Sequence, residues 1–323
     1  MKKVAIGVDI GGTNIRLGIV GPDGKVHDRV SFLTAGLGRA RLLSRLVRHI
    51  SILRKLAAKK GWKTAGAGVG APGPIDVERG FVYFFPNIPG WKDTPLKALL
   101  KKRLGMPVAV DNDANALALG EFFFGAGRGA KNIVVLTLGT GVGGGIILDG
   151  KLFHGHAYSA AEIGHLVINE NGPRCGCGNR GCLETYVGNG YFVREAQRRL
   201  RAGQKSVLRQ WTARAGQKLT PLLAARAARA RDAFAVGLWR ETAGHLASAL
   251  AGLANVLNPE RIVLGGGIAQ NGAVLFGPLR AAFRKKAFSV ATHSAKIVPA
   301  ALGLDAGVAG AGALVYARQG RGD

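Results

Sequence analysis

Three glycine-rich turns, each directly after a short apolar strand, constrain the fold of this chain more than any other feature of its sequence. The first turn separates two apolar segments, residues 4–10 and 15–20, so it predicts a strand–turn–strand hairpin. The residues of this turn are Gly11, Gly12, Thr13 and Asn14. Backbone N–H groups and a threonine hydroxyl at such a tip form a concave site for phosphate, and a hairpin turn without a ligand is the alternative. Asp9 ends the first strand, where its carboxylate could hold Mg²⁺ through water.

The second turn contains a formal GxGxxG match at Gly139, Gly141 and Gly144. A dinucleotide-binding fingerprint would need a helix to begin at the last glycine, but the sequence continues as a strand, 146–148, and a tight turn. We therefore reject a Rossmann fold. A second phosphate-binding hairpin, with the hydroxyls of Thr137 and Thr140 as donors, fits the pattern better.

The third turn follows a short buried strand over residues 262–264 and precedes an apolar helix. It consists of Gly265, Gly266 and Gly267. Backbone without side chains can come close to a flat ligand, so this turn is expected to face the adenine or ribose of a nucleotide.

The only three cysteines of the chain lie within eight positions of one another, at Cys175, Cys177 and Cys182, and His165 precedes them. Three thiolates and one imidazole make a closed tetrahedral set that is typical of structural zinc. The alternatives are unligated thiols or a disulfide between Cys175 and Cys182, and the odd cysteine count argues against a disulfide framework. His154 and His156 compete with His165 as the fourth ligand.

The length and charge of the chain limit its partners. Its 323 residues favour two domains, and its net charge of +26 comes largely from residues 39–63 and 194–231. The first of these segments has leucines at helical spacing, which predicts a helix with its cations on a solvated face. Neither segment carries a nucleic-acid motif, and no apolar run is long enough to span a bilayer. We expect no nucleic-acid partner, no membrane partner and a cytoplasmic protein, because Asp9 interrupts the apolar start of the chain.

The segments DIGGTN, APGPID, DNDANALALGE, LGTGVGGG, EIGH, CGCGNRGCLE and IVLGGGI together resemble the ROK family of sugar kinases and repressors. The resemblance runs over nearly the whole chain. It implies the α/β actin-like ATPase fold, which is ribonuclease H-like, with two domains around a cleft. The N-terminal domain would contain residues 1–110 and 299–323, and the C-terminal domain, which carries the zinc site, would contain residues 111–298.

The resemblance also assigns roles to individual residues. Asp113 would be the catalytic base for a sugar hydroxyl. The sugar would be bound by Gly73, Asn87, Asn112, Asp113, Glu162, His165 and Glu184. The donor Mg·ATP would be bound by Asp9, Gly11, Gly12, Thr13, Asn14, Thr140, Gly141, Gly265, Gly266 and Gly267. Structural zinc would be bound by His165, Cys175, Cys177 and Cys182.

Without the resemblance, the DNDAN segment has a structural interpretation. Asp111 could be a helix N-cap and Asp113 a first-turn acid that the helix dipole favours.

The implied activity is an ATP-dependent hexose kinase, with glucokinase expected first and a homodimer as the assembly. Fructose, mannose, N-acetylglucosamine or N-acetylmannosamine are alternative substrates, and the basic charge suggests polyphosphate as an alternative donor. A repressor of this family would carry a DNA-binding winged helix before the first turn, and Asp9 is expected to leave no room for one.

Overall fold

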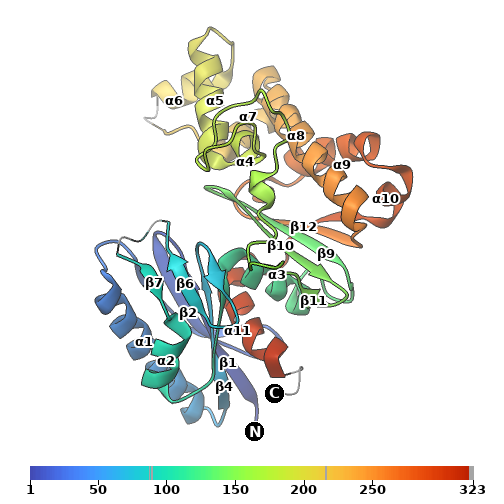
Figure 1. The fold of residues 1–323 in the computed structure, drawn as a ribbon. Helices are drawn as coiled ribbons and strands as arrows, with labels where there is room; N and C mark the ends of the chain where they lie inside the picture. Colours follow the sequence, from blue (N-terminus) through green and yellow to red (C-terminus); the bar gives the residue numbers. More distant parts are fainter. Residues whose placement is uncertain (87, 89, 215–216, 320–323) are drawn as a thin grey trace. The chain divides into compact units, whose positions relative to one another are not determined.

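The computed structural model describes residues 1–86, 88, 90–214 and 217–319 of the chain (Figure 1). Its internal contacts divide the chain into two α/β units. The first unit comprises Met1–Lys131, Gly145–Ala161 and Ala300–Asp323, and the second comprises Asn132–Gly144 and Glu162–Pro299. The expected α/β class is confirmed.

The first unit is built on a five-stranded sheet with the order β3-β2-β1-β4-β8. Its strands are β1 (Lys3–Ile10), β2 (Asn14–Val20), β3 (Val26–Leu33), β4 (Lys63–Ala71) and β8 (Val108–Asn112). The first three strands form an antiparallel meander, whereas β1, β4 and β8 are parallel. The carboxyl ends of β1 and β8 therefore lie at the same edge of the sheet. A small antiparallel sheet adds β5 (Ile75–Asp76), β6 (Phe81–Phe84) and β7 (Lys92–Thr94).

Helices cover both faces of this first sheet (Figure 1). One face packs against α1 (Arg39–Lys59) and α2 (Leu96–Leu104), and the other against α3 (Asp113–Phe124) and α11 (Ala306–Gln319). Successive residues of β1 point to opposite faces of the sheet, and each face packs against a different pair of helices. Ile6 and Val8 point into the core beside α1, whereas Gly7 lies under α11.

Glycine in the strands lets α11 approach the sheet closely. A Cβ at Gly7 would lie 2.0 Å from the carbonyl oxygen of Val308, and one at Gly68 of β4 would lie 1.7 Å from that of Ala311. No side chain fits at either distance. These two glycines therefore serve helix packing and need no ligand to explain them.

The unit boundary differs from the expected one near residue 110, because α3 is grouped with the first unit. A Cβ at Gly120 of α3 would lie 2.8 Å from the Cα of Gly310, so the backbones of α3 and α11 touch. The buried Glu121 also accepts hydrogen bonds of 3.0 Å from the backbone N–H groups of Ala301 and Leu302, just before α11. These contacts fasten α3 to the end of the chain.

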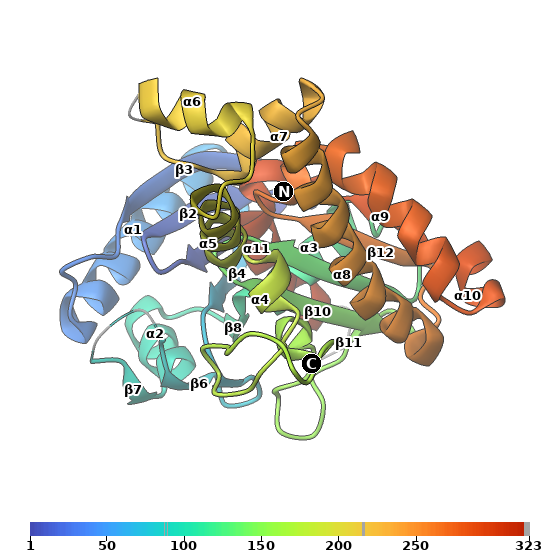
Figure 2. The same ribbon diagram turned by 90° about the horizontal axis from the view of Figure 1, so that it is seen from above.

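The second five-stranded sheet has the order β11-β10-β9-β12-β13. Its strands are β9 (Ile133–Leu138), β10 (Val142–Leu148), β11 (Lys151–Leu152), β12 (Arg261–Gly265) and β13 (Lys296–Pro299). Strands β9, β12 and β13 are parallel, and β10 and β11 form a hairpin. The helices of the second unit are η1 (Ile163–His165), α4 (Glu184–Val187), α5 (Asn189–Arg201), α6 (Val207–Arg214), α7 (Pro221–Arg229), α8 (Ala233–Leu257), η2 (Ala269–Asn271), α9 (Ala273–Lys286) and α10 (Ser289–Ser294). Figure 2 shows α8 and α9 side by side, and they pack extensively on each other.

The predicted basic helix is confirmed as α1. Its apolar residues, among them Leu42, Leu46 and Ile50, are buried, while Arg41 and Arg45 are exposed. Among the described residues, no helix combines the length and the hydropathy that crossing a membrane requires.

Candidate functional site

Two aspartates stand at the carboxyl edge of the first sheet. Asp9 is the next-to-last residue of β1, and Asp113 begins α3 directly after β8. Between their strands lies Gly70 of β4, where a Cβ would be 3.1 Å from the Cβ of Ala116 and 3.5 Å from the Cα of Asp113. Because Gly70 has no side chain, the first turn of α3 can pack directly against β4.

The environment of Asp9 disfavours its charge. Burial, and then the negative charge of Asp113, raise the pKa of Asp9 to about 6, while Arg16 acts in the opposite direction. The carboxylate also lies against α11, because a Cβ at Gly307 would be 2.4 Å from the Asp9 Oδ2. A divalent cation at this edge would relieve the repulsion between the two carboxylates, so the pair suits Mg²⁺.

The N-cap of α3 is Asn112, which corrects the structural interpretation of Asp111. The Asn112 Oδ1 accepts hydrogen bonds from the N–H groups of Ala114 (2.9 Å) and Asn115 (3.3 Å). Its Nδ2 donates to the carbonyl of Gly73 at 3.3 Å. The oxygen of Asn112 is therefore used by the helix, and only its amide nitrogen has a hydrogen left to offer a ligand. Gly73 itself is held at φ 87°, where glycine is favoured.

Asp111 instead holds the turn between β8 and α3 through its side-chain hydrogen bonds. Its buried carboxylate accepts from the N–H of Asn112 (2.7 Å) and the side chain of Asn115 (3.0 Å), and it pairs with His154 Nε2 at 2.7 Å. This pairing removes His154 as the alternative metal ligand. The pair fixes the turn that presents Asn112 and Asp113, and sequence analysis did not find it.

The first glycine-rich turn is the predicted hairpin tip between β1 and β2. The Gly11 N–H donates to the carbonyl of Asn14 at 3.0 Å. Thr34, at the end of β3, donates its N–H to the Thr13 carbonyl (2.9 Å) and its hydroxyl to the Gly11 carbonyl (2.8 Å). These bonds hold the carbonyl side of the loop, and Gly12 and Thr13 are exposed at its tip. The backbone N–H groups and the Thr13 hydroxyl at the tip are therefore accessible as hydrogen-bond donors to a ligand.

The second and third turns lie side by side at the carboxyl edge of β9 and β12. Gly265 pairs with Thr137 in register, and the Ile268 N–H donates to the Leu138 carbonyl at 3.1 Å. The second turn is closed by a 2.9 Å hydrogen bond from the Gly139 N–H to the Gly141 carbonyl. The strand that follows it, β10, confirms the rejection of a Rossmann fold.

The glycines of the third turn differ in what they touch. Gly266 has φ 86°, and a Cβ there would lie 2.4–2.7 Å from the backbone of Leu138, so glycine is required by the fold itself. Gly267 is open, with only the Asn189 side chain at 4.0 Å from its Cβ position. A nucleotide contact is therefore best tested at Gly267.

The four predicted metal ligands converge. The ligand atoms of His165, Cys175, Cys177 and Cys182 all lie within 4.8 Å of one another. The His165 Nδ1 is 3.7 Å from the Cys175 Sγ, and the Cys177 Sγ is 3.7 Å from the Cys182 Sγ. Such spacings surround a tetrahedral centre with bonds of about 2.0–2.3 Å. The cluster therefore fits a zinc ion, and His165 is the histidine in it.

Short backbone pairings bring the cluster together. The Leu183 N–H donates to the Leu166 carbonyl at 2.8 Å, which places Cys182 beside His165. A turn closed by the Cys175 N–H and the Asn179 carbonyl (2.8 Å) holds the other thiols. A backbone hydrogen bond from Asn179 lowers the pKa of Cys177, whereas burial raises the pKa of Cys182 to about 12, so the metal-free cluster would keep the Cys182 thiol protonated.

Glu184 links the cluster to the second turn. It begins α4 two residues after Cys182, and its Oε2 accepts from the Val142 N–H at 2.8 Å. A Cβ at Gly141 would lie 2.5 Å from the same oxygen, so glycine makes room for the carboxylate. Glu162 precedes η1, and its carbonyl accepts from the His165 N–H at 2.9 Å.

The predicted site residues thus fall into two groups, one in each unit. The first unit holds Asp9, the first turn, Gly73, Asn112 and Asp113, and the second unit holds the other two turns, Glu162, Glu184 and the metal cluster. Asn87 lies outside the described residues.

Known proteins share this architecture. The model of the ROK family matches residues 5–318. The glucokinase of Thermotoga maritima is 40% identical over 323 residues, covering 99% of each chain. The structure of a ROK family glucokinase from Streptomyces griseus, in complex with glucose and AMPPNP, is 36% identical with a TM-score of 0.80, covering 97% of this chain and 99% of that one. An inorganic polyphosphate/ATP-glucomannokinase from Arthrobacter sp. strain KM is 29% identical with a TM-score of 0.61, covering 98% and 99% of the two chains.

The raised pKa of Asp9 predicts a pH-dependent gain in stability for Asp9→Asn. Ionising Asp9 costs more in the folded than in the unfolded chain, so this carboxyl stabilises the fold below pH 4 and that contribution is lost as the pH rises through about 6. Relative to wild type, the variant should gain up to roughly 3 kcal/mol between pH 4 and pH 8, because one pKa unit is worth about 1.4 kcal/mol. Urea unfolding without Mg²⁺ measures the difference. A difference that stays constant over this range would show that Asp9 titrates normally.

Proposed function

Because this chain belongs to the ROK family, we propose that it is an ATP-dependent glucokinase, which converts D-glucose and ATP to D-glucose 6-phosphate and ADP. The observation that carries the proposal is the full-length similarity to a glucokinase, at 40% identity over 99% of both chains. The same comparisons assign the chain the actin-like ATPase fold of these kinases. Asp9, Asp113 and the two hairpin turns supply the groups that phosphoryl transfer requires.

Asp113 is proposed as the general base that takes the proton of the attacking sugar hydroxyl. Its position in the first turn of α3 favours the carboxylate form, since the helix dipole stabilises negative charge there. Its Oδ1 accepts the Ala114 N–H at 2.8 Å, which fixes the orientation of the group. The Asp111–His154 pair holds the same turn from the other side.

The donor is proposed to bind through backbone groups. The exposed tip at Gly12 and Thr13, and the turn at Thr140 and Gly141, would offer N–H groups and hydroxyls to the phosphates. Mg²⁺ held near Asp9 would neutralise phosphate charge. The open Gly267 would face the nucleoside.

The sugar is proposed to lie against the carboxylates of Glu162 and Glu184, His165, and the amide of Asn112. Carboxylates accept hydrogen bonds from sugar hydroxyls in pairs, so these side chains suit a hexose. Zinc at the four-ligand cluster would have no open position for water and would act as a scaffold that positions His165 and Glu184.

Polyphosphate is kept as a second candidate donor. The net charge of +26 favours a polyanion, and the Arthrobacter relative is named for both donors. A homodimer and a cytoplasmic location complete the proposal: the homodimer rests on the family resemblance alone, and the location on the expectation from the sequence.

The role of Asp113 predicts that Asp113→Asn lowers kcat by about 10²–10⁴-fold, the usual contribution of a general base. A coupled assay of ADP release measures the loss. Asp28→Asn is the matched control, because Asp28 lies on β3 and pairs with Lys60. The assignment fails if Asp113→Asn keeps more than about a tenth of the wild-type rate.

The cluster predicts close to one equivalent of zinc in protein purified without added metal. Cys182→Ser should lose zinc and raise the KM for glucose, since Glu184 follows Cys182 by two residues. His156→Gln, which changes an exposed histidine outside the cluster, should keep the metal. Elemental analysis and glucose kinetics provide the two readouts. Full activity in a metal-free preparation would rule out the structural role.

The third turn predicts that Gly267→Val raises the KM for ATP at least about fivefold, because the new side chain would overpack the nucleoside site. The KM for glucose should change little. Gly237→Val, at an open position on α8, controls for the substitution itself. If polyphosphate is a donor, its KM should be unaffected, as it has no nucleoside. Equal increases in the KM for ATP and the KM for glucose would instead show that Gly267 is needed for the folding of the second unit.

A further inference from the structure

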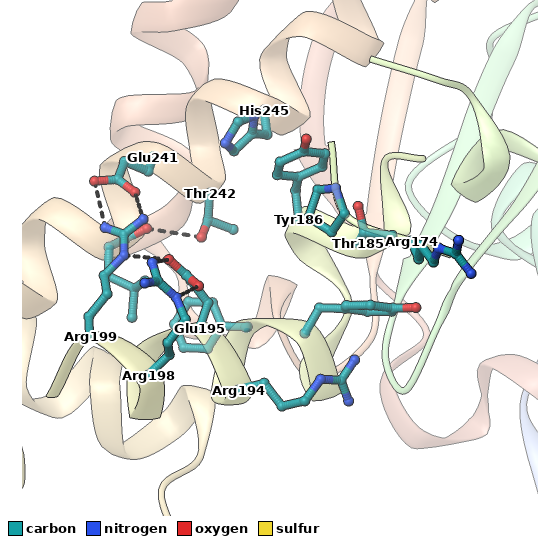
Figure 3. Close-up of a pocket in the computed structure, with 14 residues that line it drawn as sticks. Arg174, Thr185, Tyr186, Arg194, Glu195, Arg198, Arg199, Glu241, Thr242 and His245 are labelled. Carbon is teal, nitrogen blue, oxygen red and sulfur yellow. Dashed lines mark hydrogen bonds and ion pairs between the residues drawn. The ribbon is translucent and has the colours of Figure 1, made fainter. Parts of the chain in front are cut away.

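A cavity lies in the second unit beside α4, the short helix whose Glu184 binds the second turn. Its volume is about 630 Å³, within the usual range of small-molecule sites. It is lined by α5, α8, the residues Thr185 and Tyr186 of α4, and the Pro173–Arg174 segment of the metal loop (Figure 3). None of the predicted sugar, donor or metal ligands lines it.

One end of this cavity is an ion-pair network whose charges are satisfied. Arg198 donates to Glu195 through Nε (2.8 Å) and Nη2 (2.7 Å). Arg199 donates to Glu195 at 2.6 Å and to both oxygens of Glu241 at 2.9 and 2.6 Å. The hydrogen bonds from Arg198, followed by those from Arg199, lower the pKa of Glu195 to about 2. Both carboxylates are therefore already paired with arginines.

The other end carries two arginines without a carboxylate partner among the described residues. Figure 3 shows Arg174 and Arg194 at the end opposite to Glu241. Arg194 lies over the ring of Tyr191 at 4.3 Å, which orients its guanidinium without neutralising it. Four arginines against two glutamates leave an excess of two positive charges in the lining.

Neutral groups form the middle of the cavity. The ring centroids of Tyr186 and His245 lie 4.1 Å apart with the rings tilted by 32°. Burial lowers the pKa of His245, which favours the uncharged imidazole. An uncharged imidazole offers one donor and one acceptor, and in the described part of the chain no residue hydrogen-bonds to it. Aromatic faces beside a free donor and acceptor suit the polar ring of a small organic ligand.

We propose that this cavity binds a phosphate monoester, with the phosphate at the end that Arg194 and Arg174 line and the organic part toward Tyr186 and His245. A monoester carries close to two negative charges at pH 7, which matches the excess of two positive charges. Guanidinium groups recognise phosphate oxygens through paired hydrogen bonds. A monocarboxylate would leave one arginine unneutralised.

The position of the cavity gives the ligand a means to regulate the kinase, and this part rests on the proposed function. Thr185 and Tyr186 directly follow Glu184, which binds the second turn, and Arg174 directly precedes Cys175. A ligand that bridges α4 and the metal loop therefore acts on the proposed sugar site. Occupancy is expected to change the affinity for glucose, and with it the KM. Glucose must then change the affinity for the ligand by the same factor as the ligand changes the affinity for glucose.

Isothermal titration calorimetry of the zinc-containing enzyme tests the binding. Glucose and a non-hydrolysable ATP analogue are kept at saturation, so that the active site is occupied, and glucose 6-phosphate, AMP and inorganic phosphate are the probes. Arg194→Gln should weaken the binding of a monoester at least about tenfold, as expected for the loss of one charge-assisted hydrogen bond. Arg240→Gln removes an exposed charge from α8 outside the cavity and should leave binding unchanged.

The three probes separate the sources of the phosphate. Tighter binding of glucose 6-phosphate or of AMP than of inorganic phosphate identifies a sugar or a nucleotide as the organic part. Equal binding of all three would overturn a monoester-specific cavity. Equal affinities of wild type and Arg194→Gln would overturn the site itself, and this result does not depend on whether the protein is a glucokinase. Binding without a change in the glucose KM would overturn the regulatory part alone.

Discussion

The meeting of two carboxylates at one edge of the first sheet is the constraint on which the rest of this unit depends. The parallel order β1-β4-β8 brings Asp9 and Asp113 to the same edge, and glycines at positions 70 and 307 leave room for α3 and α11 beside them. The cost of this arrangement appears as the raised pKa of Asp9. Ionisable groups with perturbed pKa values commonly cluster at functional sites. A bound cation would remove the repulsion between the Asp9 and Asp113 carboxylates.

In the second unit, a continuous series of contacts joins the metal cluster to the second turn. Cys182 is held beside His165 by the pairing of Leu183 with Leu166, and Glu184 follows at once and binds the Val142 N–H. A metal at the cluster would therefore fix the Glu184 carboxylate and the second turn together. Thr185 and Tyr186 of the same short helix line the cavity with Arg174 and Arg194, so α4 is the element that all three features share.

Features that depend on neighbours in the sequence could be predicted from it. The turns at residues 11–14 and 139–141, the basic helix and the cluster of one histidine and three cysteines are set by local turn chemistry and spacing. The pairing of Asp111 with His154 could not be predicted, because 43 residues separate them. The same holds for Gly266, whose need for glycine arises from Leu138 on another strand, and for α3, whose place in the first unit depends on α11. The choice of Asn112 over Asp111 as N-cap also follows from that distant pairing.

The proposed reaction is the transfer of the terminal phosphoryl group of ATP to glucose. Its most direct test is ³¹P NMR of the products when the purified protein is given ATP and one of several hexoses: glucose, fructose, mannose, N-acetylglucosamine or N-acetylmannosamine. We expect glucose 6-phosphate and ADP in equal amounts, and the highest kcat/KM for glucose among these hexoses. Release of ADP and inorganic phosphate without a sugar phosphate, or a clear preference for another hexose, would contradict this expectation.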